Sequence, residues 1–251
     1  TIPFSEEEIQ YRREHDLKAS ASTQSRIFTG KAAHSCRPQL GENAIVKMLD
    51  YLTQLPAGLA VMDLDGGFNH NSVPSNAVLE IDLMGGFQNP IVPKISEILH
   101  VARRVEREFK LYPDHQENPL FPTMNIGMIR TQERFVQITG SCRLPASVPE
   151  SVYEGWMDQL NKCCLDQGAT FRIIDHKPGF YGPQDSKLLE SAAKQLKEMG
   201  VPVNFRPSIA ATEASVFSRR GIECLIFGPG ESLGNSHAPD ERVSLQQLEQ
   251  A

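Results

Sequence analysis

The chain has 251 residues and a formal net charge of −6, with 40% hydrophobic and 22% charged residues. This length allows one large domain or two modest ones, and the composition is that of an ordinary globular protein. The acidic balance provides no basic surface for nucleic acid, and no apolar run approaches the length of a membrane span.

Cysteine usage indicates a reducing compartment. The five cysteines are scattered and form no CxxC pair, so free thiols are expected. The first residues, TIPFSEEEIQYRREHD, lack the layout of a signal peptide. Together these features predict a cytoplasmic protein. Cys36 lies two residues from His34, but no third residue that would orient a nucleophile–base pair is evident.

The first half of the chain alternates strand and helix patterns. Residues 1–23 are highly charged and end in a loose ASAST stretch, so we expect a connector outside the core, with Ser5–Glu8 as a solvated acidic helix start. QSRIFTG is typical of a short strand. Helical spacing then begins after Gly41 and ends at Pro56; its apolar positions are Ile45, Met48, Leu49, Leu52 and Leu55.

The next segments continue this alternation. NAVLEIDLM alternates apolar and acidic residues like a half-buried strand, and residues 91–111 have the stripe of an amphipathic helix. RFVQITGSCRLP is a strand pattern, with Arg143 on its polar side. Ser147 and Glu150 have the spacing of a capping box that would begin a third helix, and TFRIID is again a strand pattern. Residues 26–175 are therefore predicted to form an α+β layer.

The pattern changes at the Pro/Gly-rich loop KPGFYGPQD, a candidate domain boundary. A helix is predicted over residues 186–199 and a short strand near VPVNF. IECLIF is a continuous apolar run, which is typical of a strand covered on both faces, and it ends in a Gly-Pro-Gly turn.

Two histidines stand in loops suited to chemistry. His34 lies among small residues in GKAAHSCRPQLGENAI, and His237 lies in GNSHAPDERV beyond the Gly-Pro-Gly turn. A histidine at the edge of a sheet is a candidate metal ligand or general base, although many loop histidines are only solvated. Glu213, beside Thr212, is also explained as an acid at a helix start.

Several motifs occur in an informative order: GKAAHSCRPQLGENAI, NSVPSNAVLEIDL, PTMNIGMI, CRLP, ATEAS and FGPGESLGNSHAPDERV. In this order they resemble metallopeptidase family twenty, the zinc-dependent hydrolases that include acetylornithine deacetylase, succinyl-diaminopimelate desuccinylase, aminoacylase and several dipeptidases. The resemblance extends from Arg26 to Val243.

The resemblance implies an α/β fold in which an α+β lid, or dimerisation domain, is inserted into a zinc-peptidase-like catalytic domain. Residues 1–25 would then be a connector from the catalytic domain, 26–175 the lid, and 176–251 the C-terminal part of the catalytic domain. The lid would make a homodimer. Members bind two zinc ions, with cobalt or manganese as alternatives.

The resemblance also implies site residues. His237 matches a zinc ligand, and His34 matches a lid histidine that stabilises the oxyanion in the partner subunit's site. Asn71 lies near the same oxyanion in this comparison, and Arg143 holds the substrate carboxylate. The remaining substrate contacts are Thr212, Gly228 and Gly230.

The family's other metal ligands and its paired glutamates precede the lid, and residues 1–25 contain no equivalent. The implied function of the full-length protein is metal-dependent hydrolysis of an amide bond in a small substrate with a carboxylate, by deacylation or by peptide cleavage. This chain alone is expected to be inactive. The alternative is a non-catalytic dimerisation or binding module derived from the family.

Overall fold

The computed structural model describes residues 1–15, 23–56, 58–83, 86–113, 121–180, 185–205, 212–231, 235 and 240–251. The strands are β1 (Ile2–Pro3), β2 (Thr23–Thr29), β3 (Ala33–His34), β4 (Ala60–Gly66), β5 (Ser72–Val73), β6 (Asn76–Asp82), β7 (Thr123–Thr131) and β8 (Phe135–Arg143). The helices are α1 (Glu6–His15), α2 (Ala44–Leu52), α3 (Ile91–Glu108), α4 (Glu150–Asp166), α5 (Lys187–Glu198), α6 (Ala214–Ser218) and α7 (Leu245–Gln250), with 3-10 turns η1 (Pro38–Leu40) and η2 (Phe109–Leu111).

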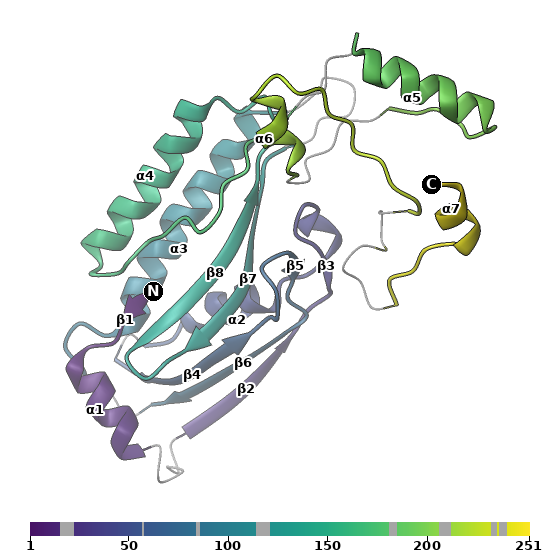
Figure 1. Ribbon diagram of the computed structural model, residues 1–251. Coiled ribbons are helices and arrows are strands. Elements are labelled where there is room, and N and C mark those ends of the chain that lie inside the picture. Colours follow the sequence, from purple (N-terminus) through teal and green to yellow (C-terminus); the bar gives the residue numbers. More distant parts are fainter. Residues whose placement is uncertain are drawn as a thin grey trace.

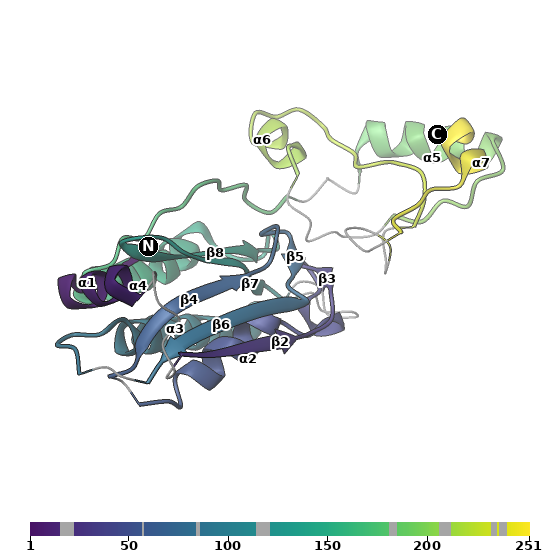
Figure 2. The same ribbon diagram turned by 90° about the horizontal axis from the view of Figure 1, so that it is seen from below.

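Six strands form one antiparallel sheet in the order β1-β8-β7-β4-β6-β2. Helices α3 and α4 lie side by side behind this sheet (Figure 1). A separate two-stranded ladder, β3 with β5, lies near the end of the large sheet at which β7 begins and β8 ends (Figures 1 and 2). Among the described strands, β2 pairs only with β6, so it is an edge of the sheet.

The core follows the apolar periodicity of the sequence. The inward positions of α2 and β6 are buried: Ile45, Met48, Leu49, Leu52, Ala77, Leu79 and Ile81. A second cluster joins α3 to α4, where the rings of Phe109 and Trp156 lie 4.7 Å apart. The Trp156 indole N–H donates to Glu108 at 2.8 Å, so this buried polar atom has its hydrogen bond.

The N-terminal segment belongs to the core, so the expectation that it lies outside is wrong for residues 1–15. Ile2, Phe4 and Ile9 are buried, and β1 adds an edge strand to β8. Glu8, expected to be solvated, is only 1% exposed. Its carboxylate accepts from the backbone N–H groups of Ser5 and Ile91, both at 2.8 Å, and so caps the start of α3.

One helix begins later than its sequence pattern predicts. The capping box at Ser147 is wrong, since α4 starts at Glu150 with Pro149 in the cap position. A proline disfavours helical geometry in the residue before it, which keeps Val148 outside the helix. Helix α5 begins where predicted, because the Ser186 hydroxyl accepts from the backbone N–H groups of Leu188 and Leu189.

Three predicted strands are absent from the described part of the chain: residues 170–175, 201–205 and 222–227. Residues 222–227 are the clearest case, because Ile226 and Phe227 are more than half exposed rather than covered. An apolar run becomes a buried strand only beside neighbouring strands, and the described residues place none there. The domain boundaries at residues 25 and 175 stay predictions. None of the helices in the described ranges combines the length and apolar character that a membrane span requires.

Candidate functional site

His34 is held in a defined orientation by its own strand. It belongs to β3 and pairs with Ser72 of β5. The backbone N–H of Cys36 donates to Nδ1 of His34 at 3.0 Å. Because Nδ1 accepts this hydrogen bond, the neutral ring carries its proton on Nε2. The neutral imidazole is therefore a hydrogen-bond donor at Nε2.

Asn71 and Arg143 are joined directly. Arg143, at the end of β8, donates from Nη2 to the Oδ1 atom of Asn71 at 2.5 Å. The backbone carbonyl of Asn71 accepts from the N–H of Ser35 at 2.9 Å, next to His34. Three residues that were predicted from separate motifs thus lie close together at one end of the sheet, where Ser35, the neighbour of His34, connects the histidine segment to Asn71.

The guanidinium of Arg143 retains unused donor capacity. Its Nε atom is buried and has no hydrogen-bond partner among the described residues. A buried donor without a partner is costly, and a carboxylate is the acceptor whose geometry best fits a guanidinium. The predicted role of Arg143 in binding a substrate carboxylate stays a prediction.

Cys36 is not activated as a nucleophile. Burial raises the pKa of its thiol, and the nearby guanidinium groups of Arg37 and Arg143 only partly oppose this shift. The contact to the His34 ring comes from the backbone N–H of Cys36 and not from its sulfur. Since the thiolate is the reactive species, the arrangement argues against catalysis by Cys36.

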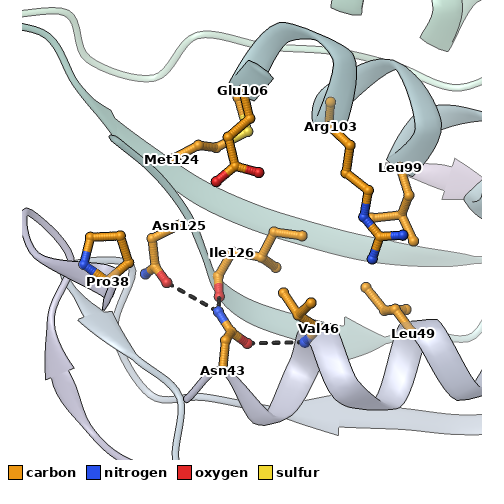
Figure 3. A pocket seen from close by; sticks show the side chains of 11 residues that line it. Pro38, Asn43, Val46, Leu49, Leu99, Arg103, Glu106, Met124, Asn125 and Ile126 are labelled. Atoms are coloured by element: carbon orange, nitrogen blue, oxygen red, sulfur yellow. Dashed lines mark hydrogen bonds between the residues drawn. The ribbon is translucent and has the colours of Figure 1, made fainter. Parts of the chain in front are cut away.

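Sequence reasoning assigned no role to Asn125, although it quoted the PTMNIGMI segment that contains it. Asn125 lies on β7 and donates to the carbonyls of Ser72 at 2.9 Å and of His70 at 3.4 Å. It accepts from Asn43 at 3.1 Å. Figure 3 shows these two asparagines beside a cavity of about 190 Å³ between α2, α3 and β7.

The predicted substrate contacts in the C-terminal part are not joined to this group. The Thr212 hydroxyl accepts from the backbone N–H of Ala214 at 3.3 Å, at the start of α6. Gly228 and Gly230 lie in an exposed segment, where Gly230 has φ +89°. Helix α6 is tied to α4 because Arg219, which follows α6, pairs with Glu150 at 3.1 Å.

His237, the predicted zinc ligand, lies outside the described residues. Within the described ranges, no group of three or more His, Cys, Asp or Glu side chains is arranged to hold a metal ion. The described residues therefore do not by themselves form a zinc site.

Comparison with known proteins identifies the first part of the chain. Residues 16–94 match the family described as Peptidase dimerisation domain, of the M20 peptidases. Residues 16–94 are therefore similar to the dimerisation domain of M20 peptidases. The matched residues include β2 to β6 and both His34 and Asn71. The resemblance to metallopeptidase family twenty and the expected mixed α/β fold are thereby confirmed.

Two curated relatives match a longer part of the chain than the family does. Acetylornithine deacetylase of Myxococcus xanthus is 24% identical over 200 residues, which are 76% of this chain and 48% of the relative. Acetylornithine deacetylase of Proteus mirabilis (strain HI4320) is 26% identical over 200 residues, which are 74% of this chain and 46% of the relative. The chain spans about half the length of these curated relatives.

Two solved structures match most of this chain at low sequence identity. Aminoacylhistidine dipeptidase from Vibrio alginolyticus has a TM-score of 0.48 and 17% identity, covering 92% of this chain and 56% of that chain. Aminopeptidase PepT from Bacillus cereus ATCC 10987 has a TM-score of 0.24 and 14% identity, with coverages of 80% and 41%.

Proposed function

We propose that this chain is the lid and an adjoining part of a metal-dependent hydrolase that cleaves an amide bond in a small substrate with a free carboxylate. The substrate would be an N-acyl amino acid or a short peptide. The observation that carries this proposal is the cluster of His34, Asn71 and Arg143 from three distant segments. In it, Arg143 donates to Asn71, and the Asn71 carbonyl accepts from Ser35 beside His34. The M20 dimerisation domain and the two deacetylase relatives support it.

The chemistry we assign to the lid is stabilisation of developing negative charge. Attack on an amide carbonyl forms an oxyanion, and the Nε2–H of His34 and the amide N–H₂ of Asn71 are donors of the type that bind it. A donor aimed at an oxyanion contributes about 3–4 kcal/mol to stabilisation of the transition state. Arg143 would hold the substrate carboxylate, with Thr212, Gly228 and Gly230 as further substrate contacts.

We assign His237 as one ligand of a zinc pair whose other ligands lie outside the described residues, with cobalt or manganese as substitutes. Zinc, when bound, polarises the carbonyl and lowers the pKa of bound water. The five free cysteines support a cytoplasmic location.

We further propose a homodimer formed through β2. This strand is an exposed sheet edge within the dimerisation domain, and Ile27 on it is 69% exposed. An unpaired edge presents a row of backbone donors and acceptors to a second copy. His34 follows β2 by five residues. Pairing of β2 with β2 of a second copy would therefore bring His34 close to the partner subunit.

The decisive experiment uses the complete parent protein. Its zinc content and its hydrolysis of a panel of N-acyl amino acids and dipeptides are measured for wild type, His34→Ala and His237→Ala. We expect His34→Ala to keep its metal and lose about 10²–10³-fold in kcat. The His237→Ala variant should lose metal and turnover together. His100→Ala, which removes an exposed histidine of α3, is the matched control and should behave as wild type. A parent that binds no transition metal and cleaves none of these substrates would favour the non-catalytic dimerisation module instead.

A further inference from the structure

Asn125 lies directly behind the loop that carries Asn71. Its side chain comes from β7 and is almost fully enclosed, with the residue only 2% exposed. Its Nδ2 group donates to the carbonyl oxygens of His70 and Ser72, at 3.4 and 2.9 Å. These two residues flank Asn71 in the chain. One buried amide therefore holds the backbone on both sides of a proposed oxyanion donor.

The loop that Asn125 binds also contacts the segment that contains His34. Ser72 is the residue of β5 that pairs with His34 of β3, and the backbone carbonyl of Asn71 binds the N–H of Ser35. The loop that Asn125 holds is thus the strand partner of the segment that presents the imidazole. A shift of residues 70–72 would move both donors together.

The orientation of the Asn125 amide is determined by a directed chain of hydrogen bonds. Asn43 caps α2, because its Oδ1 accepts from the Val46 N–H at 3.0 Å. Its Nδ2 group must then face the other way, and it donates to Asn125 Oδ1 at 3.1 Å and to the Ile126 carbonyl at 2.8 Å (Figure 3). Since Oδ1 of Asn125 is occupied by this donor, its Nδ2 group faces the loop.

The packing around the loop leaves little room for adjustment. A Cβ atom added to Gly127 of β7 would lie 2.5 Å from the His70 Cα atom and 2.8 Å from the Asn69 carbonyl oxygen. On the adjacent strand, the Ser141 hydroxyl donates to the His70 carbonyl at 2.9 Å. The strand and the loop are thus in direct backbone contact, and Asn125 supplies polar contacts where the two meet.

We propose that Asn125 is a positioning residue that sets the place of Asn71 and His34 for the hydrolytic reaction, with Asn43 fixing its orientation; this rests on the proposed function. Asn125 touches no substrate in this role. It acts through backbone carbonyls, so its loss should depress turnover while leaving carboxylate binding by Arg143 largely in place.

The test compares two substitutions in the complete protein. Asn125→Asp keeps the size of the side chain but replaces the N–H₂ group, which donates to two carbonyl oxygens, with an oxygen atom that accepts. We expect kcat to fall about 10–100-fold, as for other losses of geometric alignment, with KM within about twofold of wild type. Asn43→Ser keeps a capping oxygen for α2 but loses the donor to Asn125, and it should lower kcat in the same direction by a smaller factor. Asn76→Asp is the matched control, because Asn76 is an exposed asparagine of β6.

A second readout does not depend on turnover. Hydrogen exchange at the Ser35 amide, which is bonded to the Asn71 carbonyl, should speed up at least tenfold in Asn125→Asp and stay unchanged in Asn76→Asp. Wild-type kcat and wild-type Ser35 protection in folded Asn125→Asp and Asn43→Ser, while His34→Ala loses turnover, would overturn this inference and leave the proposed function standing. A parent without hydrolase activity would overturn both the proposed function and the catalytic role of Asn125.

Discussion

The guanidinium of Arg143 donates a hydrogen bond of 2.5 Å to the carboxamide oxygen of Asn71, a residue 72 positions earlier in the chain. Arginine has donors only, so the atom that it meets must be the oxygen of the amide. The N–H₂ group of Asn71 is therefore directed away from Arg143. Arg143 thus orients one proposed oxyanion donor through Nη2, and we assign the rest of its guanidinium to the substrate carboxylate.

This relationship predicts that lysine cannot replace Arg143. An ammonium group keeps the charge but lacks the planar fork that binds two acceptors at once. In the complete protein, Arg143→Lys should raise KM about tenfold or more for a substrate with a free carboxylate, and it should also lower kcat because Asn71 loses its partner. Steady-state kinetics with the acid and with its carboxamide analogue measure both effects.

Arg104→Lys, at an exposed position of α3, serves as the control for this substitution. If Arg143→Lys lowers kcat/KM by the same factor for the acid and for its carboxamide analogue, Arg143 does not bind the carboxylate.

The β2 edge predicts a variant that dissociates the dimer. Ile27→Glu places a charge on an exposed edge strand, and in a symmetric pair of strands two such charges would come close together. We expect a mostly monomeric protein by sedimentation velocity at micromolar concentration. Ile174→Glu, at a position that is 83% exposed but outside any strand, should leave the oligomeric state unchanged. A dimer that survives Ile27→Glu would place the interface elsewhere.

The spacing of apolar residues correctly predicted those elements whose buried face follows from their own sequence. The alternation of Ala77, Leu79 and Ile81 correctly predicted the inner face of β6, and the apolar stripe of Ile45 to Leu52 correctly predicted the buried side of α2. The same reasoning failed for residues 222–227, because a strand depends on neighbours that a local pattern does not reveal.

The candidate site was predictable only in part. Motif order placed His34, Asn71 and Arg143 in one family pattern, but the contacts that fix them join distant residues. Asn125 binds carbonyls 53 and 55 positions away, and nothing in its own segment indicates which partners it finds. Glu8 was missed for the same reason, since the helix start that it caps lies 83 positions later.

We therefore expect that replacing Glu8 lowers the free energy of unfolding substantially, although its sequence context is that of a solvated helix start. Glu8→Ala removes the acceptor for the N–H groups of Ser5 and Ile91 in a buried setting. Hydrogen bonds to a charged group contribute about 1.5–3 kcal/mol each, so we expect a loss of at least 2 kcal/mol in the free energy of unfolding. Urea unfolding followed by circular dichroism measures it.

The comparison variant is Glu14→Ala, which removes an exposed glutamate of the same helix and should cost less than about 0.5 kcal/mol. Equal stabilities of the two variants would show that Glu8 does not stabilise the start of α3.

Asp63 of β4 predicts a dependence of stability on pH. Burial raises the pKa of its carboxyl above the ordinary value of 3.8, the nearby carboxylates Asp65 and Glu80 raise it further, and hydrogen bonds from Thr131 and Leu64 only partly oppose the shift. The folded state therefore binds this proton more tightly than the unfolded state. The contribution of Asp63 to the stability of the folded state is therefore most favourable below pH 3.8, and it is lost as the pH rises through the raised pKa.

Asp63→Asn, which is uncharged at every pH, should consequently unfold at a higher temperature than wild type at pH 7. The difference should shrink as the pH falls toward 4, where the wild-type carboxyl takes up its proton. Thermal unfolding followed by circular dichroism from pH 4 to pH 8 measures this, with Asp158→Asn on the exposed face of α4 as the control for loss of one charge. If the Asp63→Asn difference is the same at pH 4 and pH 7, titration of Asp63 is not coupled to folding, and the effect comes from packing alone.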